Sequence, residues 1–92
     1  MKDLNTVPVP AEGLTVQKVG SETIILTSAG EQLHTLDETG SFLWSKMDGS
    51  NNLGALLDML CTGYNVPRHT AQRDLAIFMR ELEEKGLVLR SC

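Results

Sequence analysis

The sequence predicts an α+β domain, in which a three-stranded antiparallel sheet is followed by three helices. Two observations lead to this prediction. Between residues 14 and 36, three short segments have the composition of strands and are separated by turns that contain Gly or Ser. Between residues 37 and 85, the apolar residues instead recur with the 3.6-residue period of helices.

The size of the chain limits it to one small domain. It has 92 residues and a mass of 10.1 kDa, with 41% hydrophobic and 22% charged residues, as is typical of a globular protein. We expect residues 1–11 to form a flexible tail, because Pro8 and Pro10 disfavour regular structure, and residues 12–90 to form the domain. No apolar run is long enough to cross a bilayer and no secretory signal is visible, so we expect a cytoplasmic protein.

The three strands are predicted over residues 14–19, 23–27 and 32–36. The first alternates apolar and polar residues, and the second is rich in β-branched residues, as a central strand would be. In the third, the apolar residues Leu33 and Leu36 are three positions apart, which is an odd spacing for a flat strand. Either one face of this strand is not fully buried, or the strand bends before the next residue.

Two helices are predicted in the middle of the chain. Asp37 can cap the first, over residues 38–47, and Gly49 can end it in a left-handed conformation. Asn52 is a favourable N-cap for the second helix, which Gly63 can end. The second helix carries an apolar stripe at positions i, i+3, i+4 and i+7, formed by Leu53, Leu56, Leu57 and Leu60.

A third helix is predicted between Pro67, which suits a first helical turn, and Gly86, which stops it. Its apolar face is formed by Ala71, Leu75, Phe78, Met79 and Leu82. A short loop joins the second and third helices, as in a helix-turn-helix. The whole arrangement is therefore winged-helix-like, with the sheet moved to the front of the chain.

The charge of the chain is acidic but uneven. The net charge of −4 and the pI of about 5.0 argue against generic binding of nucleic acid, which needs a basic face. Residues 1–66 carry three Lys and eight acids, a net charge of −5, whereas residues 67–92 carry five cations and four acids, a net charge of +1. The cations of the last third form either a solvated helix face or contacts for an acidic ligand.

No pattern for catalysis or metal binding is present. The possible metal ligands, His34, His69, Cys61 and Cys92, form no closely spaced pair, so we expect neither a metal site nor any other cofactor. With no secretion signal, the two cysteines are not expected to form a structural disulfide. The sequence holds no nucleophile elbow and no phosphate-binding glycine loop, so an enzyme acting alone is not expected.

One residue of the third helix stands apart from its apolar face. Ile77 lies on the far side of the helix, near Arg73 and Arg80. A single exposed Ile is common and needs no explanation. Alternatively, it forms an apolar spot framed by two arginines, which would fit an apolar anchor flanked by acids, while a free strand edge nearby takes the backbone of the same ligand.

An ordered set of short motifs runs through the chain. The first half of the set is Leu36-Asp37-Glu38-Thr39-Gly40, Leu43-Trp44 and Met47-Asp48-Gly49. The second half is Leu57 to Leu60, Tyr64, Asp74-Leu75, Phe78-Met79, Leu82 and Gly86-Leu87-Val88. The set resembles the family of PQQ-biosynthesis protein D (PqqD), and the resemblance covers about residues 14–90. Asp37 stands where the family more often has Asn, and either residue can cap the helix.

The resemblance implies a non-catalytic module that binds the leader segment of a ribosomally made precursor peptide and presents the peptide to a modifying enzyme, which in PQQ biosynthesis is a radical-SAM enzyme. It also implies that the leader docks as an added strand on the third strand, in a groove against the third helix. The expected peptide-binding residues are Gln32, Leu33, His34, Thr35 and Leu36 on the strand and Arg73, Asp74, Ile77 and Arg80 on the helix. Leu75 and Phe78 are expected to serve mainly the core, with edges that can line the groove, and the face of the third helix that lines the groove stays open.

Two other functions and the oligomeric state stay open at this stage. The chain could be a small winged-helix DNA-binding or regulatory protein, with residues 67–85 as the recognition helix, although the acids of this segment nearly cancel its cations. It could also be a scaffold that binds only the enzyme. We expect no membrane partner, and either a monomer or a strand-paired or swapped dimer, because a free strand edge can pair with another copy.

Overall fold

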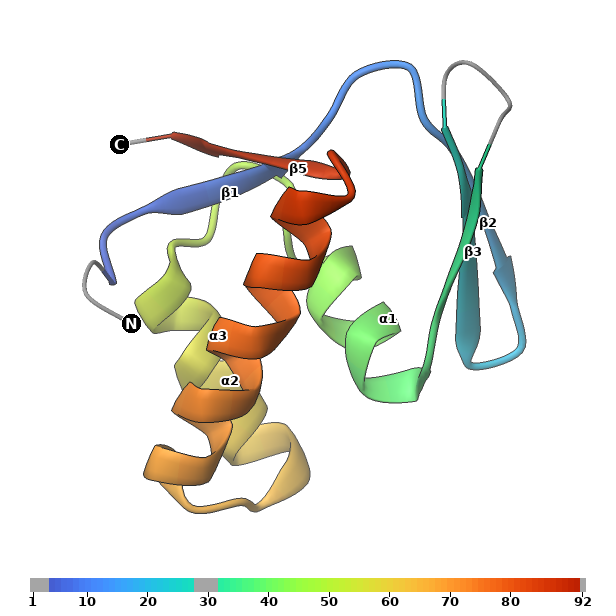
Figure 1. Ribbon diagram of the computed structural model, residues 1–92. Helices are drawn as coiled ribbons and strands as arrows, with labels where there is room; N and C mark the ends of the chain where they lie inside the picture. Colours follow the sequence, from blue (N-terminus) through green and yellow to red (C-terminus); the bar gives the residue numbers. More distant parts are fainter. Residues whose placement is uncertain (1–3, 28–31, 92) are drawn as a thin grey trace.

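The computed structural model describes residues 4–27 and 32–91, so Cys92 and the first three residues of the predicted tail lie outside it (Figure 1). It confirms the predicted α+β class, with an antiparallel sheet in the order β2-β3-β4 followed by three helices. A second sheet of two strands, β1 and β5, was not predicted. The elements are β1 (Val7–Pro10), β2 (Thr15–Val19), β3 (Glu22–Leu26), β4 (Leu33–Leu36), α1 (Glu38–Ser45), α2 (Leu53–Tyr64), α3 (Arg68–Glu84) and β5 (Val88–Ser91).

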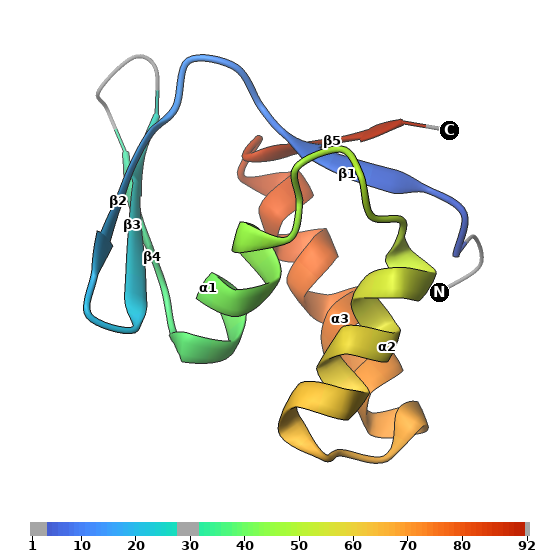
Figure 2. The ribbon, with the colours of Figure 1, turned by 180° about the vertical axis from the view of Figure 1, so that it is seen from behind.

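The helices lie on one side of the three-stranded sheet. Both views of the ribbon show α1 between this sheet and the pair formed by α2 and α3 (Figure 1 and Figure 2). In the register of the sheet, Ile25 is opposite His34 and Thr23 is opposite Leu36, so these four side chains share the face turned toward the helices. Ile25 and Leu36 are buried there in the apolar core.

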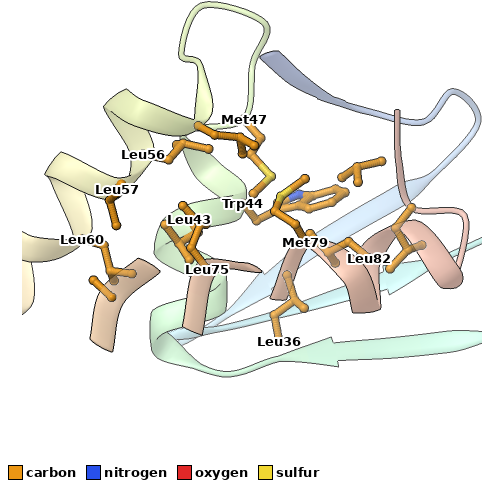
Figure 3. Close-up of a cluster of buried hydrophobic side chains, with 14 of the residues drawn as sticks. Leu36, Leu43, Trp44, Met47, Leu56, Leu57, Leu60, Leu75, Met79 and Leu82 are labelled. Atoms are coloured by element: carbon orange, nitrogen blue, oxygen red, sulfur yellow. The ribbon is translucent and has the colours of Figure 1, made fainter. Parts of the chain in front are cut away.

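The core is one cluster of side chains contributed mainly by the three helices. Figure 3 shows Leu36 reaching from β4 into this cluster. α3 buries the stripe formed by Ala71, Leu75, Met79 and Leu82, as its periodicity predicts. Phe78 is only half-buried and lies at the border of the core.

A buried chain of hydroxyl groups ties β3, β4 and α1 together. Thr23 Oγ1 donates to Ser41 Oγ at 2.7 Å, and Ser41 Oγ donates to the main-chain oxygen of Leu36 at 3.3 Å. Because a buried hydroxyl without a partner is costly, this arrangement favours one register of β4 and one placement of α1.

Side-chain caps begin α1 and α2 where the sequence predicts them. Asp37 accepts the N–H of Gly40 at 2.8 Å, and Asn52 accepts the N–H of Ala55 at 2.8 Å. The ends of these helices differ from the prediction. α1 ends at Ser45 rather than at residue 47, and α2 continues through Gly63.

The residue that ends α2 is Asn65, with a φ of 52°. Asn tolerates the left-handed conformation because its short side chain can hydrogen-bond locally, so a glycine is not required at the end of a helix. The sequence interpretation chose the nearest glycine and placed the end of the helix too early.

The prediction of an irregular tail over residues 1–11 is wrong for Val7–Pro10, which form β1 and pair antiparallel with β5 (Figure 1). The N–H of Ala11 donates to the oxygen of Leu87 at 2.9 Å. By the alternation of an antiparallel ladder, the backbone of residues 7 and 9 also faces β5, while Pro8 and Pro10 turn away from it. The prolines therefore occupy the positions at which a missing N–H costs no ladder hydrogen bond.

The segment before β1 also completes the first turn of α2. The main-chain oxygen of Thr6 accepts the N–H of Leu53 at 2.8 Å, and the oxygen of Leu4 accepts the N–H of Gly54 at 2.9 Å. These are N–H groups that a helix cannot satisfy by itself. The folded domain thus begins earlier than the predicted residue 12.

We predict that Val9→Pro destabilises the domain more than Val9→Ala does. Both variants lose the side chain, but only the proline removes an N–H that faces β5. The difference should be about 1–2 kcal/mol, which corresponds to a difference in Tm of roughly 4–16 °C for a domain of this size. Thermal unfolding followed by circular dichroism measures it, and equal Tm values for the two variants would contradict the pairing of β1 with β5.

Candidate functional site

The open edge of β4 is the first part of the candidate site. Within the described residues, β4 is bonded to β3 alone. The N–H of Thr27 donates to the oxygen of Gln32 at 3.1 Å, which fixes the alternation of the ladder. The backbones of residues 34 and 36 therefore face β3, and those of Leu33 and Thr35 face the open edge. Two N–H and two C=O groups are thereby offered to an added strand.

The side chains of β4 divide between its two faces. Leu36 is buried, and the half-buried His34 points to the same side, where its Nε2 atom is buried without a hydrogen-bond partner in the described part of the chain. Leu33 lies on the opposite face and is 63% exposed. Two explanations were open for the odd spacing of Leu33 and Leu36. The first is correct, because the face of the strand that carries Leu33 is not buried.

The sheet has a second edge, at β2, but its surroundings differ. β2 is exposed along its whole length and carries Lys18, and charged residues on an edge discourage the pairing of further strands. β4 contains no Lys, Arg, Asp or Glu, and it leads directly into α1. The β4 edge is therefore the better place for strand addition.

A cavity of about 450 Å³ opens where β4 ends. It lies between the start of α1, the end of α2 and the middle of α3. Its apolar wall is formed by Leu43, Leu60, Val66 and Phe78, and its polar wall by Asp37, Thr39, Tyr64 and Asp74. The two Leu residues are buried and the two Asp residues are exposed, so the cavity has an apolar floor and an acidic mouth.

Gly40 shapes one wall of this cavity. A Cβ atom at this position would lie 3.1 Å from Cε1 of Phe78, 3.2 Å from Oδ1 of Asp37 and 3.3 Å from Cβ of Leu36. These distances are shorter than ordinary carbon contacts. Only glycine therefore lets the ring of Phe78 pack against the first turn of α1.

The described residues show no catalytic or metal-binding cluster at this cavity. No group of three or more His, Cys, Asp or Glu side chains in residues 4–27 and 32–91 could hold a metal ion. The pKa shifts lie at surface groups that do not line the cavity. Hydrogen bonds from Ser50 lower the pKa of Asp48, and the bond to Asp58, at 2.7 Å, raises the pKa of Arg68. Within the same ranges, no helix is long and apolar enough to span a membrane.

The structure divides the helical residues that the sequence predicted for the site. Asp74 lines the cavity beside β4. Arg73, Ile77 and Arg80 lie instead around a separate hollow on the outer side of α3. The five predicted strand residues stay together in β4 and directly before it, but only Leu33 and Thr35 turn their backbone groups to the open edge.

Sequence reasoning missed several residues of the cavity. Phe78 was assigned mainly to the core, with only its edge at the groove, although its spacing of four from Asp74 places both on one side of α3. Thr39, Tyr64 and Val66 come from other elements. Only the packing of α1 and α2 against α3 brings them to the cavity, and no local pattern shows it.

An open strand edge beside a helix-lined cavity offers the backbone groups and the side-chain pocket that strand addition of an extended peptide requires. A comparison with protein families confirms the resemblance seen in the sequence. The model of the family described as coenzyme PQQ synthesis protein D (PqqD) matches residues 22–88, and the chain belongs to this family.

Two solved structures are similar to the chain. The structure of TbiB1 in complex with the TbiA(beta) leader peptide is 28% identical, with a TM-score of 0.81 over 87% of this chain and 93% of that one. The structure of a lasso peptide synthetase B1 complexed with the leader peptide is 19% identical, with a TM-score of 0.81 over 90% of this chain and 98% of that one. The second similarity concerns the fold alone. A comparison with curated proteins gave no match.

We predict opposite effects for alanine at two helical glycines. Gly63→Ala in α2 places its Cβ 3.8 Å from Phe42, an ordinary contact, and should stabilise the domain by about 0.5–1 kcal/mol through helix propensity. Gly40→Ala forces the Phe78 ring aside and should destabilise the domain by about 0.5–2 kcal/mol in spite of the same gain in propensity. Urea unfolding measures the free energy of unfolding of both variants. A Gly40→Ala variant that is more stable than the wild type would show that the packing of the Phe78 ring does not depend on the absence of a Cβ at position 40.

Proposed function

We propose that the protein is a non-catalytic module that recognises the leader segment of a ribosomally synthesised precursor peptide and presents the peptide to a modifying enzyme. The observation that carries the proposal is the open edge of β4 beside the cavity, in a chain of the PqqD family. The similarity to TbiB1, whose structure holds a leader peptide, supports it.

In this proposal the leader adds a strand to β4. The N–H and C=O groups of Leu33 and Thr35 then exchange up to four hydrogen bonds with the peptide backbone. Each such bond contributes about 0.5–1.5 kcal/mol net. Main-chain bonds do not read the peptide sequence, so discrimination among peptides has to come from side chains.

The cavity supplies the discrimination. Alternate side chains of an added strand point to the face that holds the helices, and one of them can enter the cavity at the end of β4. Burial of a large apolar side chain there is worth about 1.5–3 kcal/mol. The exposed carboxylates of Asp37 and Asp74 at the mouth favour a side chain whose tip donates a hydrogen bond.

These contributions have to offset the ordering of a flexible peptide. We expect dissociation constants between nanomolar and micromolar, because the loss of peptide entropy reduces the binding free energy that one short strand and a few anchors supply. The partner enzyme, a radical-SAM enzyme in a PQQ-type pathway, and a cytoplasmic location, where ribosomal peptides are made, belong to the same proposal.

We predict that Thr35→Pro weakens leader binding at least tenfold and leaves the fold intact. The proline removes an N–H that faces the open edge and no bond to β3. Lys18→Pro is the matched control. Because β3 turns residue 25 toward β4, it turns residue 24 toward β2, so Gln17 faces β3 and Lys18 faces the other open edge. Fluorescence anisotropy with labelled leader should show unchanged affinity for the control, and equal losses in both variants would contradict docking at β4.

An NMR titration tests the proposal as a whole. We expect the leader half of the precursor peptide encoded beside the protein to shift the amide signals of Leu33 and Thr35 and those around Gly40 and Phe78 in the ¹⁵N-labelled protein. Signals of β2 should move much less. A folded protein whose signals do not move at about 100 μM peptide, well above the expected dissociation constants, would refute leader recognition.

A further inference from the structure

We infer that the outer face of α3 is the docking surface for the modifying enzyme, and that the enzyme meets it with an apolar side chain surrounded by carboxylates. This inference rests on the proposed function. The outer α3 face is defined by the residues around a hollow of about 440 Å³, namely His69, Gln72, Arg73, Ala76, Ile77 and Arg80.

The composition of this face is typical of an interface. Ile77 lines this face and is 51% exposed, and arginines lie at positions i−4 and i+3 from it. Arginine is enriched in protein interfaces, where it combines an apolar stem with a charge that forms directed hydrogen bonds. An exposed apolar side chain alone would mean little, but here it shares a hollow with the two cations.

The charge of the face is available to a partner. Arg73 Nε lies 4.0 Å from Asp74 Oδ1, at the limit of an ion pair, and both side chains are exposed. Arg80 makes no salt bridge within residues 4–27 and 32–91. Arg68, in contrast, is held by Asp58 at 2.7 Å. A basic face on a chain of net charge −4 favours an acidic partner surface.

The position of the face separates it from the leader. Asp74 and Phe78 line the cavity beside β4, and no residue of the outer α3 face lines it. Ile77 is three positions from Asp74 and therefore lies at the border between the two surfaces. A peptide added to β4 and anchored in the cavity therefore leaves the outer α3 face open. Presentation of a peptide requires that the leader and the enzyme bind to the protein at the same time. The outer α3 face provides a second binding site for this purpose.

α3 can hold both partners in a fixed geometry. Its inner stripe, with Leu75 and Met79 at its centre, is completely buried. In Figure 1, α3 lies in front of α2, and α1 and the three-stranded sheet lie to one side of it. The helix therefore forms a rigid wall with the leader on one side and the enzyme on the other.

The test uses a double variant and a matched control. Ile77→Ser with Arg80→Glu alters the outer α3 face, and Val19→Ser with Lys18→Glu makes the same kinds of change on β2, where Val19 is also 51% exposed. Two affinities are measured for each protein. One is for the fluorescein-labelled leader, and the other is for the modifying enzyme encoded beside the precursor, with leader at saturation.

We expect the leader affinity of all three proteins to agree within twofold. The enzyme affinity should fall at least tenfold in the Ile77/Arg80 variant and stay within twofold in the control, and the binding of the enzyme to the wild type should weaken as salt rises. Unchanged Tm values exclude unfolding as the cause. The single variant Arg80→Gln should also lower the affinity for the enzyme, but by less than the double variant does.

Each other outcome overturns a different statement. A wild type that binds the leader but not the enzyme, or a variant with unchanged enzyme affinity, overturns this inference alone. A parallel loss of leader affinity would assign the face to the peptide groove. Salt-sensitive binding of a 20-base-pair DNA duplex that the variant loses would assign it to nucleic acid. A wild type that does not bind the leader would refute the proposed function instead.

Discussion

The pairing register of β4 with β3 is the constraint on which the candidate site depends. A shift by one residue would move Leu36 from the core to solvent and turn the outward main-chain groups of Leu33 and Thr35 toward β3. The burial of Leu36 and the hydroxyl chain from Thr23 through Ser41 oppose such a shift. The same contacts fix the start of α1, and with it the position of the cavity relative to the open edge.

The packing of α3 against α1 links this register to the cavity. Gly40 brings Phe78 into contact with the first turn of α1, at the point where β4 ends. Since side chains in packed interfaces do not deform continuously, an anchor that moves Phe78 also acts on the turn that follows the strand. The open backbone edge and the cavity are therefore structurally coupled and do not act as independent sites.

The sequence was sufficient wherever one interaction dominated a short segment. The caps Asp37 and Asn52 and the apolar stripes predicted the helices and the order of the elements. β1 was missed because the sequence shows Pro8 without showing that its nitrogen turns away from β5, which depends on a partner 80 residues later. The groove against the third helix and its residue Asp74 were expected from the resemblance, but the walls from α1 and α2 were missed, since Val66 and Thr39 come to one cavity only through tertiary packing.

The cavity also explains how an exposed strand edge can favour a peptide over a second copy of the protein. Self-pairing of β4 would gain main-chain hydrogen bonds from only two residues of each copy, because the strand is four residues long and is followed at once by α1. A peptide gains the same bonds and buries an anchor in the cavity as well. The short strand limits pairing between copies, and the cavity adds the free energy that selects the peptide.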